Sequence, residues 1–136
     1  MTQEDHIYLQ VFIVTYLHQL SPTINNGLYY MQYILWYYIQ NGYTGTPTEL
    51  LRQAAKRYGR HPNTIASCIQ RFARGAFQQD DDAEVIIARW QEIGWDETKT
   101  LTTSNIISLV CQGFFSYMER HYPERHQELS KIAPPR

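Results

Sequence analysis

The sequence predicts an all-α fold: a single compact domain of six to seven helices with a central helix-turn-helix. Apolar residues recur at three- and four-residue spacing in successive segments, which is the period of a half-buried helix. Clusters of proline, glycine and asparagine separate those segments. The length of 136 residues suits one domain with a substantial core. We therefore expect a helical domain over residues 1–132 and a frayed tail over residues 133–136.

The first two predicted helices differ in how much of their surface is apolar. The first, over residues 5–20, is expected to bury a stripe made of Ile7, Val11, Val14 and Leu17 or His18. Ser21-Pro22 ends it, because proline disfavours helix in the residue before it. The second runs over residues 26–40 behind Asn25 or Asn26, and its segment LYYMQYILWYYI is apolar on nearly every side. Residues 27–43 contain no charge, so we expect this helix in the core or an interface rather than in a base-stacking platform.

The helix-turn-helix is predicted over residues 46–77. Thr46 can cap the first helix and Glu49 can complete a capping box, and Gly59 can end it in the left-handed conformation. Pro62 then starts a second helix, which runs to about Phe77. The apolar positions expected to be buried are Leu50, Leu51, Ala54, Ala55 and Tyr58 in the first helix and Ile65, Cys68, Ile69 and Phe72 in the second. Two helices joined by so short a turn are typical of DNA-binding domains.

The last part of the chain predicts three further helices. Asp80, Asp81 and Asp82 are expected to cap a helix over residues 83–93, because an EF-hand would also need a central glycine and a terminal glutamate. Its stripe would contain Val85, Ile86, Ala88, Trp90 and Ile93. Thr102 or Thr103 is expected to cap the next helix, and Pro123 to start a short final helix that ends near residue 132. We expect His121 and His126 at the surface, since their spacing does not place two metal ligands on one helical face.

Positive charge is concentrated in the helix-turn-helix. Residues 47–77 hold six of the twelve Lys and Arg residues and one of the thirteen acids, a local charge of +5 in a chain whose net charge is −1. Such a segment can present a positive face to phosphate. The alternative is a pair of ordinary surface helices with solvated bases. We prefer DNA binding because the motif and the charge coincide.

Two sets of residues would carry DNA binding. The helix after Pro62 is expected to enter the major groove, where Arg pairs with guanine, Asn or Gln with adenine, and a methyl group contacts thymine. The base-reading candidates are Asn63, Thr64, Ala66, Ser67, Gln70 and Arg71. Phosphate contacts fix register without reading sequence, and their candidates are Arg52, Lys56, Arg57, Arg60, His61 and Arg74. His61 could equally serve only as a helix cap.

Other classes of function find little support in the sequence. No Ser-His-Asp, Cys-His or paired-carboxylate arrangement and no phosphate-binding glycine loop stands out, so we do not expect an enzyme. We expect no cofactor and no metal site, and Cys68 and Cys111 are expected to be reduced core residues. No apolar run reaches the length of a membrane span, and residues 1–20 contain no basic segment ahead of an apolar one. These observations predict a cytoplasmic protein that does not bind membranes.

The chain resembles the C-terminal DNA-binding (effector) domain of the stage-zero sporulation protein A response regulators of endospore-forming bacteria. The similarity covers roughly residues 8–118 and is carried by the segments LSPTINNGLYYM, ELLRQAAKRYG, IASCIQRFARGAF and LTTSNIISLVCQGF. It implies a six-helix domain that binds duplex DNA at promoters as adjacent copies and contacts RNA polymerase. That family also carries an N-terminal phosphorylated receiver domain, which the present sequence lacks, so such control would have to come from a separate protein.

Where the family has Arg, Glu and His on the outward side of its recognition helix, this sequence has Thr64, Ala66, Ser67 and Gln70. The family's DNA preference therefore does not transfer. The alternative hypothesis is a protein-interaction module or antagonist that has lost specific DNA reading on the same fold. A single domain with few phosphate contacts binds DNA weakly, so we expect a homodimer at least on DNA. Its candidate surfaces are the aromatic second helix and the stripe around Phe114, Phe115 and Tyr117.

Overall fold

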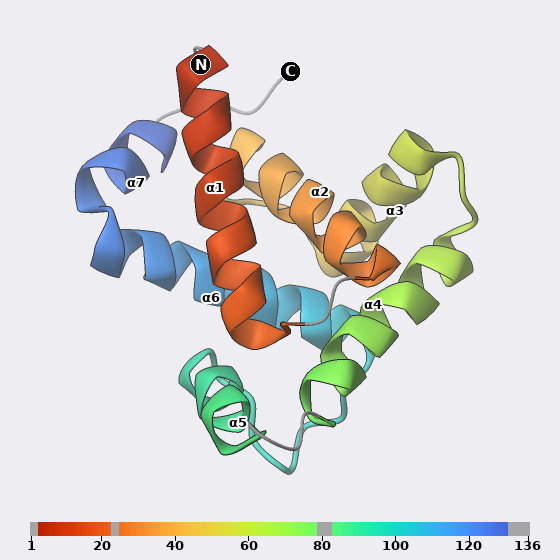
Figure 1. Cartoon of the computed structure of the whole chain (residues 1–136). Helices are drawn as coiled ribbons and strands as arrows, with labels where there is room; N and C mark the ends of the chain where they lie inside the picture. The colour runs from red at the N-terminus through yellow and green to blue at the C-terminus, as the bar shows by residue number, and fades with distance from the viewer. Residues whose placement is uncertain (1–2, 23–24, 79–82, 131–136) are drawn as a thin grey trace.

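The computed structural model describes residues 3–22, 25–78 and 83–130, with backbone only for residues 129 and 130. All regular structure in this part of the chain is helical, which confirms the predicted fold class. Figure 1 shows the seven helices. They are α1 (Gln3–Leu20), α2 (Asn26–Gln40), α3 (Pro47–Tyr58), α4 (Pro62–Ala76), α5 (Ala83–Glu92), α6 (Thr103–His121) and α7 (Pro123–Ser130). The predictions for Asp80, Asp81, Asp82 and residues 133–136 lie outside the described residues.

Helix α2 lies at the centre of the fold, because its surface is apolar in almost every direction. It packs against α1, α3, α4 and α6, and Met31, Ile34, Leu35 and Ile39 are fully buried. Asn25 caps its first turn by accepting a hydrogen bond from the Leu28 amide at 3.1 Å. Of the two environments considered for this helix, the core is the one observed.

Helix α1 buries a face that matches the predicted stripe only at Leu17. Its core side chains are Leu9, Ile13, Tyr16, Leu17 and Leu20. Ile7 and Val11, which were expected in the core, are 59% and 54% exposed. The prediction was wrong for these two residues because α1 carries two apolar stripes at helical spacing, and the spacing alone cannot decide which one meets the rest of the domain. In Figure 1 α1 crosses the front of the molecule, with its outer face toward the viewer.

Helix α5 is hydrogen-bonded to the last turn of α1. The Trp90 indole N–H donates to the Leu20 carbonyl at 2.8 Å, and the Arg89 guanidinium donates to the Gln19 carbonyl at 3.1 Å. These bonds satisfy carbonyls that the end of a helix leaves without an intrahelical donor. Only Ile86 and Trp90 of α5 are fully buried, whereas Val85, which the sequence placed on the buried stripe, is 50% exposed.

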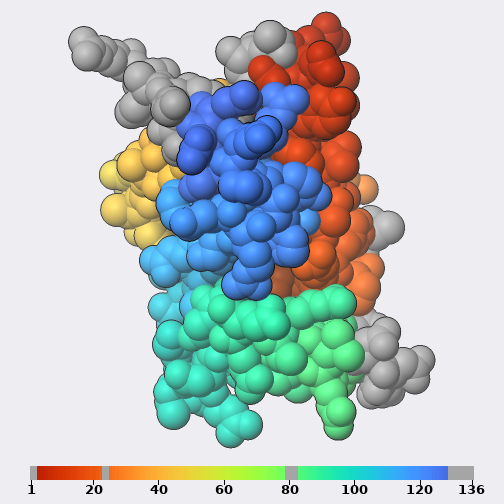
Figure 2. Space-filling view, turned by 90° about the vertical axis from the view of Figure 1, so that its left-hand side faces the viewer, coloured from red at the N-terminus to blue at the C-terminus, as the bar shows by residue number. Residues whose placement is uncertain are grey.

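In Figure 2, α7 and the end of α6 (blue) lie in the middle of the face, beside α1 (red) and above α5 (green). Phe114 is fully buried, while Phe115 and Tyr117 are half-buried against neighbouring rings. The stripe around Phe114, Phe115 and Tyr117, which the sequence suggested as a dimer surface, therefore packs mostly against other residues of the same chain.

His126 is buried, not at the surface as predicted. Its ring lies 4.4 Å from the Phe115 ring centroid, and Nδ1 is 3.3 Å from the Tyr43 hydroxyl. The prediction rested on the spacing of His121 and His126, which excludes a shared metal site but does not exclude burial, and this side of α7 turns toward α2 and α6.

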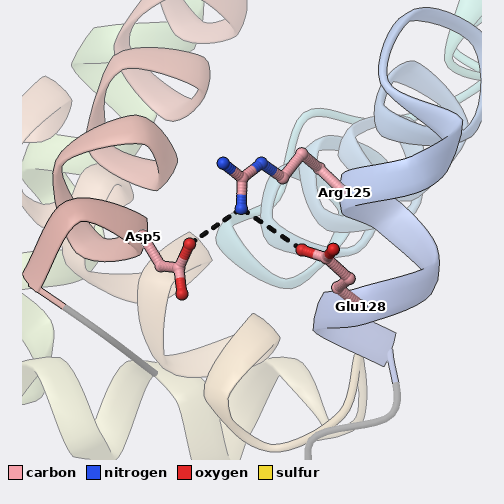
Figure 3. Close-up of polar contacts among 3 residues, drawn as sticks. All are labelled: Asp5, Arg125 and Glu128. Carbon is pink, nitrogen blue, oxygen red and sulfur yellow. Dashed lines mark hydrogen bonds and ion pairs between the residues drawn. The ribbon is translucent and has the colours of Figure 1, made fainter.

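Figure 3 shows how α7 is tied to the first helix. Arg125 donates to the Asp5 carboxylate at 2.8 Å and to Glu128 at 3.2 Å. The same guanidinium lies 5.2 Å from the Tyr8 ring centroid, within cation–π range. The pairs are partly exposed, so solvent screening leaves each of them with little effect on stability. They orient α7 more than they stabilise the domain.

No helix in the described part of the chain is long and apolar enough to cross a membrane. Cys68 and Cys111 lie as free thiols, the first half-buried and the second buried. Burial strongly raises the pKa of the Cys111 thiol.

Candidate nucleic-acid interface

The turn between α3 and α4 is fixed by local contacts that the sequence predicted. At the start of α3, Thr46 and Glu49 form the capping box. At its end, Gly59 adopts φ 61° and ψ 37°, and its N–H donates to the Ala55 carbonyl. His61 then caps α4, because its Nδ1 accepts from the Asn63 amide at 3.1 Å. Three residues thus connect the two helices, with both helix ends satisfied.

The inner face of α4 anchors it in the core. Ile65, Ile69, Phe72, Ala73 and Ala76 are fully buried, and the helix packs against α2, α3 and α6. The approach to α2 is especially close at Gly27, where a Cβ atom would lie 2.2 Å from the Cys68 carbonyl oxygen. Helix α4 is therefore held firmly, with its opposite face turned outward.

Four of the six base-reading candidates are exposed. Asn63, Ser67 and Arg71 follow one another at four-residue spacing along the outermost line of α4, and Thr64 flanks them. At 1.5 Å per residue, Asn63 to Arg71 covers about 12 Å. A helix with its side chains is about 10–12 Å across, which fits a DNA major groove about 12 Å wide.

The other two candidates, Ala66 and Gln70, are half-buried against the start of α6. The Gln70 side-chain amide donates to the Thr103 hydroxyl at 3.0 Å, and that hydroxyl lies 3.4 Å from the Ala66 carbonyl. The Gln70 amide would have to leave this bond before it could read a base. Sequence reasoning missed Thr103 as a neighbour of the site, because the two residues are 33 positions apart and no local signal connects them.

The hydroxyl of Ser67 is also engaged, since it donates to the Asn63 carbonyl at 3.0 Å. In this arrangement its oxygen presents lone pairs to the outside, where it would accept from the exocyclic amine of adenine or cytosine. Asn63 and Arg71 retain free side-chain donors in the described structure. The exposed line of α4 thus offers DNA bases the Asn63 amide, the Ser67 hydroxyl oxygen as an acceptor and the Arg71 guanidinium.

All six cations of the segment are exposed: Arg52, Lys56 and Arg57 on α3, Arg60 in the turn, and Arg71 and Arg74 on α4. In the described part of the chain, the ion pairs are those of Arg125, and none involves these six. The positive end of the α4 dipole lies beside Arg60 and adds to the same potential.

Arg57 stands somewhat apart from the other cations. It lines a shallow cleft with Tyr33, Trp36 and Tyr58, on the side of α3 that faces α2. Burial raises the pKa values of Tyr33 and Tyr58, and the nearby Arg57 charge partly opposes that rise. Tyr58 itself is 42% exposed, although the sequence placed it on the buried stripe. Of the phosphate candidates, Arg57 is the one that lies beside the aromatic residues of α2.

His61 occupies its capping role through Nδ1, so in the neutral ring the proton lies on Nε2. That N–H is free to donate outward. The two roles considered for His61, cap and phosphate contact, are compatible because they use different nitrogens. Among the described residues, no group of three or more His, Cys, Asp or Glu side chains is placed to hold a metal ion.

Comparisons with protein-family models, with curated proteins and with solved structures each found no match to this chain. The function must be argued from the site.

Proposed function

We propose that this chain is a sequence-specific double-stranded DNA-binding regulator of transcription that inserts the N-terminal half of α4 into the major groove. The observation that carries the proposal is the outer line of α4, Asn63–Ser67–Arg71, which is exposed and surrounded by cations that form no ion pair within the described residues. Asn63 and Arg71 are the principal base readers, for adenine and guanine respectively. Arg52, Lys56, Arg60 and Arg74 contact phosphates, and His61 adds a contact through Nε2.

One observation favours the second candidate, a protein-interaction module or antagonist. The Gln70 amide is held by Thr103, and only Arg71 and Arg74 carry charge on the outer face of α4. A protein partner that recognises a mostly neutral helix would use the same surface. Such a partner would not require Arg52 and Lys56, which lie exposed on α3.

The test is selection of bound duplexes from a random library, repeated at two salt concentrations. A recovered consensus at both salts supports specific reading. Uniform recovery at low salt means binding without sequence preference, and no recovery at either salt favours the protein-interaction candidate. In a salt titration, four phosphate contacts would give a slope of log K against log salt near −3.6, about 0.9 per contact.

Two variants and a control separate the roles of the residues. Arg71→Ala should relax preference at one base pair, with a loss of about 1–3 kcal/mol in discrimination. Lys56→Ala should weaken all duplexes alike and flatten the salt slope by about 0.9. Arg120→Ala is the matched control, because this exposed cation lies 17 residues along α6 from Thr103, about 25 Å from the end beside α4. If the three variants bind alike, the assignment of α4 to the groove is wrong.

A further inference from the structure

The outer face of α1 carries apolar side chains that the fold leaves uncovered. Ile7 and Val11 are mostly exposed, and Val14 and His18 continue the line half-buried. The successive spacings along this line are four, three and four residues. That alternation is the repeat by which one helix packs along another, with each side chain entering a gap between its partner's side chains. We call these four residues the α1 stripe.

The sequence that contains the α1 stripe is free of charge over a long stretch. From His6 to Thr48 the sequence contains no Asp, Glu, Lys or Arg. Depletion of charge with exposed aromatic and aliphatic residues is the composition of an interface core. It matters most where two identical surfaces meet about a two-fold axis, because each charge near the axis would face its own copy.

The charges of α1 are confined to its ends. Glu4 and Asp5 lie in the first turn, Asp5 in contact with Arg125, and His18 lies in the last turn. A parallel pair of α1 helices would place Glu4 against Glu4 and His18 against His18. An antiparallel pair places the acidic end of each helix beside the imidazole of the other, and it also opposes the two helix dipoles.

We propose that the α1 stripe is a homodimer surface on which α1 of a second copy packs antiparallel. In this arrangement Val11 of one copy faces Val14 of the other, and Ile7 faces His18. Glu4, one turn before Ile7, then lies within reach of the His18 imidazole of the second copy at both ends of the interface. The inference does not depend on DNA binding, since the α1 stripe and the cations of α3 and α4 are separate surfaces.

The α1 stripe is short, which limits the expected strength of dimerisation. Ile7 to His18 spans about 16 Å of helix axis. One such helix pair falls below the ~1,200 Å² of total buried surface found in stable complexes. Association is therefore weak and concentration-dependent, and it strengthens when two copies occupy neighbouring sites on one DNA molecule.

Sedimentation equilibrium of the full chain, from micromolar to millimolar concentration and without DNA, tests the proposal. The parent chain should show a reversible monomer–dimer equilibrium. Val11→Glu should weaken dimerisation at least about tenfold, or about 1.4 kcal/mol, because it places like charges beside the axis. Val85→Glu is the matched control, since Val85 is 50% exposed on α5 and its substitution should leave the equilibrium unchanged. Ile7→Lys gives a second test at the most exposed position, and it should also weaken dimerisation because it replaces an apolar side chain with a base opposite His18 of the other copy. Circular dichroism checks that each variant is folded.

A paired substitution tests the direction of packing. In the double variant Val11→Glu/Val14→Lys, each new acid faces a new base of the other copy only if the helices are antiparallel, so dimerisation should return. A parent chain that stays monomeric at millimolar concentration overturns the proposal. So does equal weakening by Val11→Glu and Val85→Glu, and so does a double variant that stays monomeric like Val11→Glu alone.

Discussion

Gly27 lies where α2 comes closest to α4, and replacing it with alanine tests how that contact positions the outward helix. The added Cβ would lie 2.2 Å from the Cys68 carbonyl oxygen and 2.7 Å from the Phe72 Cβ. Both neighbours belong to the side of α4 that packs on α2, and one of them is a backbone atom. A rotamer change therefore cannot relieve the overlap, and α2 must move away from α4.

The size of the effect follows from these distances. Ordinary contacts of a Cβ begin near 3.4 Å, so the two helices must separate by about 1.2 Å at this point. Overpacking of this kind costs about 1–3 kcal/mol. Alanine recovers at most about 1 kcal/mol through its higher helix propensity. We expect a net loss of about 1–2 kcal/mol, which for a domain of this size lowers the melting temperature by about 3–10 °C.

Thermal unfolding followed by circular dichroism measures the loss. Asn26→Ala is the matched control, because Asn26 is the exposed neighbour in the same turn, and its change should stay within about 0.5 kcal/mol. If Gly27→Ala melts at or above the parent temperature while Asn26→Ala is unchanged, the close approach of α2 and α4 is not a feature of the protein in solution.

Three further predictions concern the turn, a phenol and a thiol. Gly59→Ala should lower the free energy of unfolding by about 1 kcal/mol, because a φ of 61° strains a residue with a Cβ even though no atom lies within 4 Å of that Cβ. Gly59→Asn should cost less, since asparagine tolerates the left-handed conformation better. Equal melting temperatures for the parent and both variants would contradict this prediction. Burial, together with a hydrogen bond that the Tyr117 hydroxyl donates to Tyr122, raises the pKa of Tyr117 to about 12. The neutral Tyr117 phenol therefore contributes fully to the free energy of unfolding below pH 10, and this contribution is lost as the pH rises from about 10 to 12. The urea concentration at the unfolding midpoint should fall over that range. A constant midpoint would argue against the raised pKa of Tyr117. The buried Cys111 thiol should resist a disulfide reagent at pH 8 in the native chain and react once the chain is unfolded. The measurement uses a Cys68→Ser variant, in which Cys111 is the remaining thiol. Rapid labelling of the native chain would refute the burial of Cys111.

The sequence predicted best the features that are decided within a few residues. The capping box of Thr46, the left-handed Gly59 and the cap by Thr102 are all observed. Each depends on one side chain or one φ angle acting on backbone three or four positions away, so the local sequence contains all the information required. The boundaries of α3 and α4, and with them the outward line of α4, follow from these signals.

Features that depend on packing were predicted less well. The buried face of α1 could not be chosen from spacing, because both of its stripes satisfy the same pattern. The burial of His126 depends on Tyr43 and Phe115, and the hold on Gln70 depends on Thr103, all distant in sequence. Within the candidate interface, the sequence therefore identified exposed residues such as Asn63 and Arg71 but not the neighbours that restrain Gln70.

The attachment of α5 has a consequence for how the domain opens. This helix buries only Ile86 and Trp90, and it packs mainly on the end of α1. Segments with so few core contacts exchange their amide hydrogens through local openings that require less free energy than global unfolding. Amides of α5 should therefore exchange ahead of those of α2, and each opening would release the Leu20 carbonyl from its indole donor and bring Trp90 into contact with water.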